Sequence, residues 1–406
     1  MRLIVINDYL TSNAGGATNV AMSSLKTLSD AGLDVTYLAG SGSIKPSINM
    51  GRVKCIPLDM GDLLNNGSRL NAVFTGIWNI KAAQRLQEIL GEYSNKDTVV
   101  HIHSWTKSFS SIIFNILIKK KFKVVITLHD YFSACPNGAF FNYVQQSHCS
   151  LRPMSIGCAL ENCDRRSRAQ KVWRLIRHYA QNKFAKFPGK FNYFISVSNY
   201  SERILRPYLP KDAMIFRIRN PINYDKQAPA DPSKNNAYVF IGRFSIEKGT
   251  RIFAQAAQKS GVSAVFIGDG PDQEIVKKLY PQATFIGWQD AEGVAAEIRK
   301  SRAIVVPSIV HETQGLVVLE AASQGIPAIV SDDCAAVEFI QDKFSGLRFK
   351  ARNVNDLVEK LLLLERDDKL VESMGKVAYK NYWDNPSTLD NHVSLLIKCY
   401  RKILEN

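Results

Sequence analysis

The stretch Pro307–Val330, PSIVHETQGLVVLEAASQGIPAIV, has the pattern of a loop, a helix and a strand that follow an earlier strand. The apolar run 303–306 before it is typical of a buried strand, and the polar HETQG predicts a loop. Helical spacing then extends from Leu316 to Gln324, Gly325 suits the position just after a helix, and AIVS begins another strand. Parallel strands need such a helical crossover, so the stretch predicts a βαβ unit of a parallel sheet.

Two glutamates in this unit indicate a ligand that carries hydroxyl groups at both ends. Glu312 lies in the loop, and Glu320 lies about two turns into the helix. Ligands of open α/β sheets bind at the carboxyl ends of the strands, where helix N-termini present N–H groups to anions. Carboxylates repel phosphate, but they bind hydroxyl groups on either side of a diphosphate. A nucleotide sugar has this order of sugar, diphosphate and ribose.

Length and composition favour a globular protein of two domains. The chain has 406 residues, of which 46% are hydrophobic and 22% are charged, and single cores seldom grow beyond about 250–300 residues. No apolar run reaches the ~18 residues of a spanning helix. The MRLIVIND start lacks the basic and apolar segments of a signal peptide. We therefore expect a cytoplasmic protein.

The net charge of +15 suggests an anionic partner, which would be nucleic acid, a membrane surface or a phosphorylated substrate. Residues 165–190 contain nine Lys or Arg and no acid, and Arg168–Phe187 has helical spacing. Such a basic amphipathic helix either lies on an anionic bilayer or packs on its own domain with a solvated basic face. The expected apolar face holds Trp173, Ile176, Ala180, Phe184 and Phe187, and the cations on the other faces are Lys171, Arg174 and Arg177. Nucleic-acid binding is disfavoured because no recognisable module interleaves basic and aromatic residues.

The N-terminal half repeats the alternation of strands and helices. Strand patterns occur at 3–7, 35–40, 98–104, 124–130 and 193–199. Gly15-Gly16 follows the first of these strands, but the spaced glycines and the acid of a dinucleotide fingerprint are missing, which disfavours NAD. His103 and His129 end two strands that face the same crevice, and the sequence leaves a structural and a functional role open for both.

A second α/β domain follows the linker-like segment 224–236. Its strand patterns occur at 238–242, 264–270, 283–288 and 303–308. We expect one domain at 1–223, completed by 386–406, and the other at 237–385. Arg243 and Lys248 follow the first strand of this second domain, where a guanidinium fork and a mobile ammonium suit phosphate oxygens.

Four of the seven cysteines lie in the loop-like segment 133–164, which the basic helical region 165–190 follows. They are Cys135, Cys149, Cys158 and Cys163. Their spacing differs from the paired cysteines of most structural zinc sites, so a structural zinc and four reduced thiols in an ordered insertion both stay open. Disulfides are disfavoured in a cytosolic protein.

Several of these motifs together resemble the group 1 glycosyltransferases, the retaining family 4 enzymes of GT-B fold. GRFSIEKG, FIGDGPD, FIGW and HETQGLVVLEAASQGIPAIVS are similar to the nucleotide-sugar domain of that family. The GGA turn, HIHSW and TLHDYF resemble its acceptor domain. The resemblance implies an α/β protein with two doubly wound Rossmann-like domains facing a cleft, and a C-terminal helix that crosses back to the N-terminal domain. Where the family usually has Gly-Phe, this chain has Thr313-Gln314, so we expect Gln314 to influence the choice of donor.

The resemblance also implies roles for the matched positions. Glu312 would hold hydroxyls of the donor sugar, and Glu320 would hold those of the ribose. Arg243 and Lys248 would stabilise the leaving diphosphate, and His129 would contact the donor sugar from the opposite domain; these residues, Glu320 apart, form the implied catalytic set. The implied donor site comprises Gly16, Gly242, Arg243, Lys248, Glu312, Thr313, Gln314, Gly315, Leu316, Val317 and Glu320. No metal or cofactor is implied, because two cations and a helix end already neutralise the leaving group.

The favoured function is transfer of a sugar from a nucleotide sugar to a hydroxyl of a saccharide or lipid-linked saccharide, in cell-surface polysaccharide synthesis. The enzyme would be cytoplasmic or peripheral on the inner face of the cell membrane. A nucleotide-sugar epimerase of the same fold would need acids for proton chemistry across the cleft, and the sequence indicates none. A non-catalytic nucleotide-sugar binder is disfavoured because all donor-site residues are present. A glycosidase is disfavoured because one carboxylate would be tied to ribose.

Overall fold

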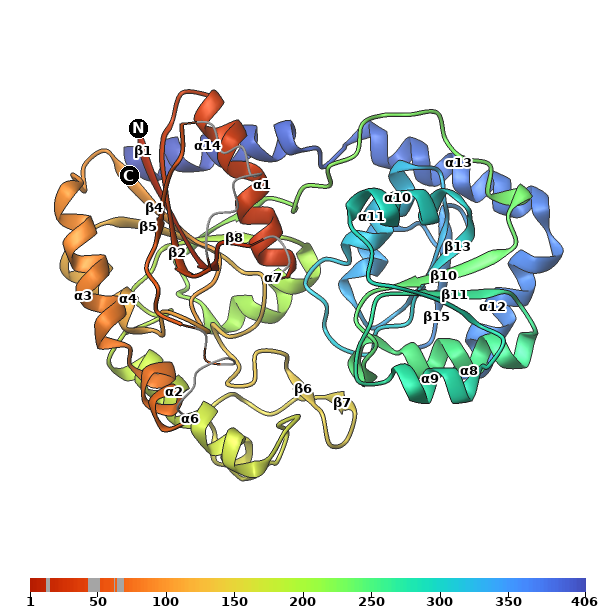
Figure 1. Ribbon diagram of the computed structural model, residues 1–406, viewed down its shortest axis with the longest axis horizontal. Coiled ribbons are helices and arrows are strands. Elements are labelled where there is room, and N and C mark those ends of the chain that lie inside the picture. The colour runs from red at the N-terminus through yellow and green to blue at the C-terminus, as the bar shows by residue number, and fades with distance from the viewer. Residues whose placement is uncertain (12–14, 43–51, 62, 64–68) are drawn as a thin grey trace.

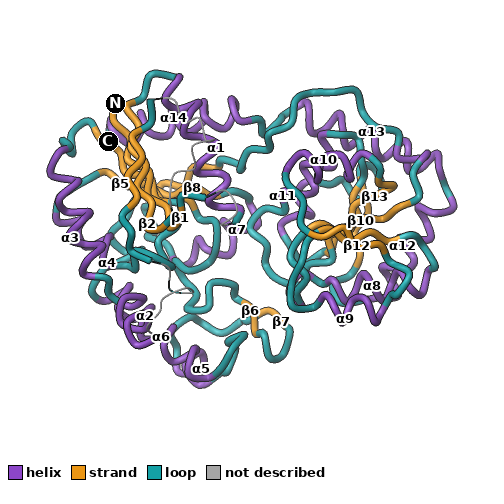
Figure 2. The backbone as a smooth tube through the Cα atoms, in the orientation of Figure 1, coloured by secondary structure: helices purple, strands orange, loops and turns teal. Residues whose placement is uncertain are grey.

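The computed structural model describes residues 1–11, 15–42, 52–61, 63 and 69–406. Two α/β domains lie side by side, the first in the red to green part of the chain and the second mainly in green to blue (Figure 1). Each domain has a central sheet with helices on both faces (Figure 2). Within the described residues, no helix combines the length and the apolar character needed to cross a bilayer.

The first domain is built on a parallel sheet of order β3-β2-β1-β4-β5-β8-β9. Its strands are β1 (Arg2–Tyr9), β2 (Asp34–Ser41), β3 (Lys54–Pro57), β4 (Thr98–Ile102), β5 (Lys123–Thr127), β8 (Tyr193–Ser196) and β9 (Met214–Arg217). Its helices are α1 (Gly16–Asp30), α2 (Arg69–Ile77), α3 (Ile80–Ile89), α4 (Ile112–Lys119), α6 (Arg168–Lys183) and α7 (Asn199–Leu205), with 3₁₀ helices η2 (Leu90–Glu92) and η3 (Arg206–Tyr208). Every strand predicted for this half is present.

The second domain has a parallel sheet of order β12-β11-β10-β13-β14-β15. Its strands are β10 (Ala237–Ile241), β11 (Ala264–Ile267), β12 (Thr284–Gly287), β13 (Ser301–Val306), β14 (Ala328–Ser331) and β15 (Gly346–Phe349). Its helices are α8 (Thr250–Ser260), α9 (Gln273–Leu279), α10 (Ala291–Arg299), α11 (Leu316–Ser323), α12 (Val354–Arg366) and α13 (Asp368–Asp384), with 3₁₀ helices η4 (Pro232–Lys234), η5 (Ile246–Lys248) and η6 (Ala335–Phe339). The predicted βαβ unit is confirmed as β13, α11 and β14, and Gly325 has a positive φ of 81° just after α11.

Strands buried on both faces explain the continuous apolar runs of the sequence. In β1, Leu3 and Val5 point to the face that α1 covers, whereas Ile4 and Ile6 point to the face that α4 covers. Successive side chains of a strand alternate between the two faces, so both faces need apolar residues. The second domain repeats this arrangement, with separate cores on the two sides of its sheet.

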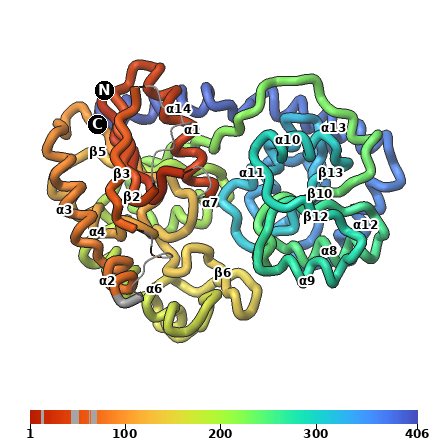
Figure 3. Tube along the Cα trace, viewed as in Figure 1, coloured from red at the N-terminus to blue at the C-terminus, as the bar shows by residue number. Residues whose placement is uncertain are grey.

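The C-terminal helix α14 (Leu389–Glu405) crosses back to the first domain, as expected for the fold. Figure 3 shows this blue helix beside the red N-terminal elements. Its residues Val393 and Tyr400 are buried against the core that β1 and α1 form. The Tyr400 hydroxyl lies 2.7 Å from Nδ1 of His101, and Nε2 of the same ring lies 2.7 Å from the Thr127 hydroxyl.

The cysteine-containing insertion 133–164 is an ordered part of the first domain. It contains β6 (Phe141–Asn142), β7 (Ser147–His148) and the short helix α5 (Ile156–Leu160). The antiparallel β6–β7 hairpin extends toward the second domain (Figure 1). Phe141 is fully buried there against Ile309 and Val310 of the second domain.

Helix α6 faces its domain differently from the prediction. Ile176 and Phe184 are 51% and 54% exposed, whereas Lys171 and Arg177 are 2% and 9% exposed. Of the two alternatives for this helix, packing with an apolar face turned inward and a basic face in solvent is therefore wrong for these residues, although Ala180 and Phe187 are buried as expected. The physical reason is that the domain supplies partners for the cations: the Arg177 guanidinium lies over the rings of Phe132 and Trp173, and thiols contact Lys171. Arg174 pairs with Asp164 at 2.6 Å.

Candidate functional site

Two turns of the second domain meet at the carboxyl ends of β10 and β13. The Lys248 Nζ lies 2.9 Å from Oε1 of Glu312, and the Ser308 hydroxyl donates to the same carboxylate. Gly249 permits this approach, because it has a φ of 70° and a Cβ there would lie 1.9 Å from the Pro307 carbonyl oxygen. The glycine after Lys248 therefore serves close packing of the two turns.

Lys248 and Glu312 stabilise each other's charged forms. Burial acts to raise the pKa of Glu312, but the Lys248 ammonium and the Ser308 hydroxyl outweigh it, so the net pKa is lowered. Burial acts to lower the pKa of Lys248, and Glu312 reverses that effect, so its pKa is raised. The second domain therefore presents a charged pair at neutral pH.

The N-terminus of α11 follows directly after this pair. Gly315 precedes the helix with a φ of 82°, and a Cβ there would lie 2.9 Å from the Cβ of Ala336. The first turn of a helix leaves N–H groups without partners in the helix, and these carry partial positive charge. In this helix they include those of Leu316 and Val317. Glu320 lies further along α11, and burial raises its pKa to about 7.

The loop between the charged pair and α11 contacts the first domain. The Thr313 hydroxyl donates to the His129 carbonyl oxygen at 3.1 Å, and the Ser198 hydroxyl donates to the Thr313 carbonyl oxygen at 2.5 Å. Oε1 of Gln314 accepts a hydrogen bond from the Asn220 amide at 2.9 Å, and its side chain is buried. The structure thus gives Gln314 a contact with the segment that joins the domains, and its expected influence on donor choice stays a prediction.

On the opposite side, the two strand-end histidines of the first domain lie together. Nδ1 of His103 is 2.9 Å from Nε2 of His129, and the two rings stack. Burial lowers the pKa of His129 to about 3 and lowers that of His103 as well. Both rings are therefore neutral, and each offers one N–H donor and one acceptor.

The other glycines of the implied donor site and Arg243 lie in the segments that follow β1 and β10. Gly16 is the first residue of α1 after Gly15, which has a φ of 113°, and residues 12–14 before it lie outside the described part of the chain. Gly242 follows β10 with a φ of 145°, and the side chain of Arg243 is exposed.

Three residues near the cleft were given no role by the sequence reasoning. Tyr131 is buried, and its hydroxyl has no hydrogen-bond partner among the residues that the structure describes. Burial raises the pKa of this hydroxyl, as does the negative charge of Glu312 nearby. Asp8 accepts hydrogen bonds from the Ser108 and Lys107 amides, so its carboxylate has a structural task.

Asp130 is the third such residue. Burial raises its pKa to about 6, and its Oδ1 accepts a hydrogen bond from the Phe132 amide at 2.9 Å. In the sequence, Asp130 and Tyr131 lie in the TLHDYF motif after a strand, and Asp8 lies near the end of the first strand.

The insertion and the residue that follows it contact the second domain beside the charged pair. Nη1 of Arg165, directly after the insertion, lies 3.1 Å from Oε1 of Glu247, the residue before Lys248. Arg352 of the second domain donates from Nε to the Gln146 carbonyl oxygen at 3.1 Å. Together with the buried Phe141, these contacts hold the β6–β7 hairpin on the second domain.

Two of the four clustered cysteines contact an ammonium group. The Lys171 Nζ lies 3.1 Å from the sulfur of Cys163 and 3.6 Å from that of Cys158. Burial acts to lower the pKa of Lys171, but the interactions with Cys163 and Cys158 together outweigh it, so the pKa is raised. In the described parts of the chain, the four cysteines do not form a set whose ligand atoms lie within 4.8 Å of one another. The structural zinc stays a prediction, which metal analysis of the purified protein checks.

Comparisons with known proteins agree with this architecture. Residues 14–226, more than half of the chain, match the family model Glycosyltransferase Family 4, and residues 222–381 match the model Glycosyl transferases group 1. A sulfoquinovosyl transferase of Arabidopsis thaliana is 32% identical over 146 residues, which are 34% of this chain and 28% of that protein. The O-antigen chain mannosyltransferase C of Escherichia coli is 25% identical over 281 residues, which are 66% of this chain and 74% of that protein.

Solved structures show the same fold. The sucrose-phosphate synthase of Thermosynechococcus elongatus has a TM-score of 0.74 at 18% identity, with 100% of this chain and 99% of that chain covered. The Anabaena protein HepE in complex with UDP has a TM-score of 0.67 at 14% identity, with 99% and 100% covered. The match of the family model to more than half of the sequence, on a fold with two facing Rossmann-like domains, shows that the chain belongs to glycosyltransferase family 4.

Proposed function

We propose that this protein is a retaining glycosyltransferase that moves a sugar from a nucleotide-sugar donor to a hydroxyl of a saccharide or lipid-linked saccharide, in cell-surface polysaccharide synthesis. The proposal rests on one observation, which is the order in which charged groups follow one another along a loop and a helix. Lys248 and Glu312 form a charged pair, the α11 N-terminus follows, and Glu320 lies further along the helix. These groups match, in order, a sugar, a diphosphate and a ribose.

The neighbouring structures support the class of donor. HepE has been solved with UDP and with UDP-glucose, whereas one sequence relative is named as a mannosyltransferase. The proposal therefore covers nucleotide sugars as a class and leaves the base and the sugar to experiment.

In the proposed reaction, the diphosphate of the donor lies at the start of α11. The bond between the anomeric carbon and the phosphate oxygen breaks, and Lys248 and Arg243 stabilise the negative charge that develops on the leaving group. The acceptor hydroxyl forms its new bond on the same face of the sugar, and its proton passes to the leaving phosphate oxygen. Glu312 holds sugar hydroxyls and Glu320 holds ribose hydroxyls, so neither of these two carboxylates is free to act as the nucleophile of a double displacement.

Two cations and a helix N-terminus at the leaving group make a metal at the diphosphate unnecessary. We expect turnover to persist when a chelator is present throughout the assay. Turnover that a chelator abolishes and Mg²⁺ or Mn²⁺ restores would contradict this part of the proposal.

A screen of UDP-, GDP- and other nucleotide sugars tests the core proposal. We expect one donor class to raise the unfolding temperature and to be hydrolysed slowly without acceptor. With an acceptor, the anomeric configuration of the product, followed by NMR from the first turnover, should equal that of the donor. Binding of none of the donors would refute the proposal, and binding without turnover would favour a non-catalytic nucleotide-sugar binder.

We further propose that the first domain docks on an anionic membrane surface, through apolar side chains that α2 and α6 expose. Phe74 of α2 is 69% exposed, Ile176 and Tyr179 of α6 are 51% and 53% exposed, and the two helices contact each other. The Trp173 ring nitrogen donates to the Val73 carbonyl oxygen at 2.9 Å and joins the two helices.

Cations flank this apolar surface at both ends of α6. Arg166 and Arg168 are exposed at its start, and Lys183 and Lys186 are exposed at its end. Apolar side chains with cations around them suit the interface of an anionic bilayer, where apolar burial and charge attraction add. Membrane docking would bring a lipid-linked acceptor to a cytoplasmic enzyme.

Sedimentation with phosphatidylglycerol vesicles at low salt tests this docking. We expect the double variant Phe74→Ser and Ile176→Ser to lose at least about tenfold in vesicle affinity. The variant Phe344→Ser provides the control, because Phe344 is 67% exposed on the second domain. Absence of binding by the unaltered protein, or equal loss in the control, would refute the docking surface.

A further inference from the structure

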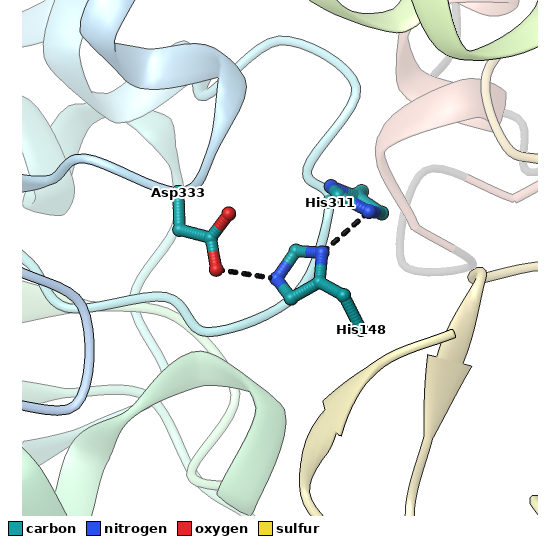
Figure 4. Close-up of side chains that lie close together, drawn as sticks. All are labelled: His148, His311 and Asp333. Atoms are coloured by element: carbon teal, nitrogen blue, oxygen red, sulfur yellow. Dashed lines mark hydrogen bonds and ion pairs between the residues drawn. The ribbon is translucent and has the colours of Figure 1, made fainter. Parts of the chain in front are cut away.

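Three potential metal ligands from distant parts of the sequence converge where the insertion meets the second domain (Figure 4). His148 belongs to β7 of the hairpin, His311 to the loop after β13, and Asp333 to the loop after β14. One potential ligand atom from each residue lies within 4.8 Å of the other two. All three side chains are half-buried.

The two imidazole rings face each other through nitrogen atoms. Nδ1 of His148 makes a short contact with Nε2 of His311, and Nε2 of His148 lies 2.8 Å from Oδ2 of Asp333. Two facing lone pairs repel each other, and two facing N–H groups collide. A proton or a metal ion between the rings is needed to satisfy both nitrogens.

Neighbouring groups orient the potential ligands. The Tyr200 hydroxyl lies 2.6 Å from Nδ1 of His311 and donates to the Asp333 carbonyl oxygen at 2.9 Å. Arg352 Nη1 lies 3.2 Å from Oδ2 of Asp333. Metal-binding histidines are usually held in this way through the second ring nitrogen, which fixes the direction of the first. The contact with Tyr200 leaves Nε2 of His311 directed at His148.

We propose that His148, His311 and Asp333 form a binding site for a divalent transition metal ion that joins the insertion to the second domain. Two imidazoles and one carboxylate favour Zn²⁺ and its neighbours Co²⁺, Ni²⁺ and Cu²⁺ over Mg²⁺ and Ca²⁺, which prefer oxygen ligands. Three protein ligands leave a fourth position for water. Ligand bonds of about 2.0–2.2 Å require the ligand atoms to approach one another, so the ion draws the three side chains together.

The ion has a mechanical consequence for the cleft. His148 comes from the first domain, whereas His311 and Asp333 come from the second, and His311 directly precedes Glu312. An ion held by both domains stabilises the arrangement in which the β6–β7 hairpin contacts the second domain. This site is distinct from the diphosphate position and does not depend on the proposed reaction.

The test uses the full chain, stripped with a chelator, and the metal alone as the probe. Calorimetric titration with Zn²⁺ should show a site that His148→Ala or Asp333→Asn weakens at least about tenfold, the scale of losing one member of a metal site. Asp333→Asn keeps the shape of the side chain, so it reports on the ligand if His148→Ala fails to fold. His178→Gln is the matched control, because His178 lies on α6 outside the cluster.

Titration with Co²⁺ separates this site from the cysteines. Binding by two imidazoles and a carboxylate gives visible d–d bands without the near-ultraviolet charge-transfer band of a thiolate ligand. We expect these bands to persist in Cys158→Ser with Cys163→Ser and to vanish in His148→Ala. In hydrogen exchange, Zn²⁺ should slow the amides of residues 141–148. Binding that the cysteine variant abolishes, or that Asp333→Asn and His148→Ala leave unchanged, would overturn the proposal.

Discussion

The two sides of the cleft are built in different ways. The second domain contributes a continuous stretch, from Ser308 through Glu312 to Glu320, and one turn from another strand that brings Lys248. The first domain contributes residues that follow several strands, together with an insertion that contacts the second domain. The charged pair lies on the second domain, whereas the paired histidines of the first domain are neutral.

The charged groups of the site thus lie on the second domain, whereas the first domain provides the insertion that contacts its partner domain. The charged site lies within one domain, so it depends little on how the two domains pack against each other. The side made by the first domain depends on contacts between segments far apart in the chain, among them the contact of the hairpin with the second domain. Loss of the charged Lys248 should therefore mainly lower kcat, whereas loss of the Phe141 contact should lower stability and raise the KM for the donor.

Phe141→Ala should have the largest energetic effect, because it removes the fully buried ring that joins the hairpin to Ile309 and Val310. Loss of a buried Phe side chain costs about 3–5 kcal/mol. We expect a lower midpoint of chemical unfolding and a raised KM for the donor. Val144→Ala in the same hairpin is the control, since Val144 is 61% exposed. Equal effects of the two variants would show that the hairpin does not hold the domains together.

Lys248→Ala tests the charged side. The loss of one contact to the leaving group should lower kcat by about 10²–10³-fold, or ~2.7–4 kcal/mol in the barrier. Arg243→Ala should lower kcat by ~2–4 kcal/mol for the same reason. The exposed Lys259→Ala is the matched control. Full turnover by Lys248→Ala would remove this residue from the proposed mechanism.

Glu320 should make nucleotide binding depend on pH. Its pKa of about 7 means that the carboxylate gains a proton as the pH falls below neutrality and then accepts ribose hydroxyls less well. We expect affinity for the nucleotide to fall by up to about tenfold per pH unit below this pKa. Glu320→Gln should flatten that part of the profile, measured as the ratio of the Kd values of the two proteins. An identical pH profile in Glu320→Gln would assign the dependence to the phosphate alone.

Protonation of Glu320 should have the opposite effect on stability: it weakens nucleotide binding, but it stabilises the folded protein. Because the folded pKa of Glu320 is above the ordinary value of 4.5, the folded state binds its proton more tightly than the unfolded state. Its contribution to stability is therefore full below about pH 4.5 and is lost as the pH rises to about 7. Without nucleotide, Glu320→Gln should raise the unfolding temperature at alkaline pH, as thermal denaturation can measure. A lowered unfolding temperature would show that the ionised carboxylate has a partner in the free protein.

Tyr131→Phe should have the smallest effect. Within the described residues its hydroxyl has no hydrogen-bond partner, so we expect the bound donor to supply one. Removal of one such hydrogen bond costs about 1 kcal/mol, which corresponds to about a fivefold rise in donor KM. Stability should not fall. Tyr280→Phe is the control with the opposite expectation, because the Tyr280 hydroxyl donates to the Val262 carbonyl oxygen. This variant should lower stability and leave the donor KM unchanged. An unchanged KM in Tyr131→Phe would exclude the hydroxyl from the donor site.

The fold was largely predictable because local patterns specify it. Apolar strands that alternate with helices predicted two parallel sheets, and Gly325 correctly marked the end of α11. The orientation of α6 was not predictable in this way. Helical spacing separates two faces, but only the tertiary partners of Lys171 and Arg177 determine which face is buried.

The candidate site was predictable to the extent that its residues are neighbours in sequence. The loop holding Glu312 and the turn holding Lys248 were each recognisable, and the structure brings them together. Gln314 contacts Asn220, and the Tyr131 hydroxyl has no hydrogen-bond partner among the described residues. Both features depend on how the domains pack, and no local sequence pattern indicates this packing. The same holds for His148, which reaches His311 only because the insertion spans the domain boundary.

The return of α14 to the first domain also constrains synthesis. The hydrogen bond between Tyr400 and His101 joins residues 299 positions apart, and the entire second domain lies between them. Domains generally fold in order as they leave the ribosome. The first domain leaves the ribosome first, but it can bind α14 only after the second domain has been translated. A nascent chain that stalls after the second domain would therefore carry a complete second domain beside a first domain whose core still lacks α14, so apolar surface of that core would stay exposed until translation ends.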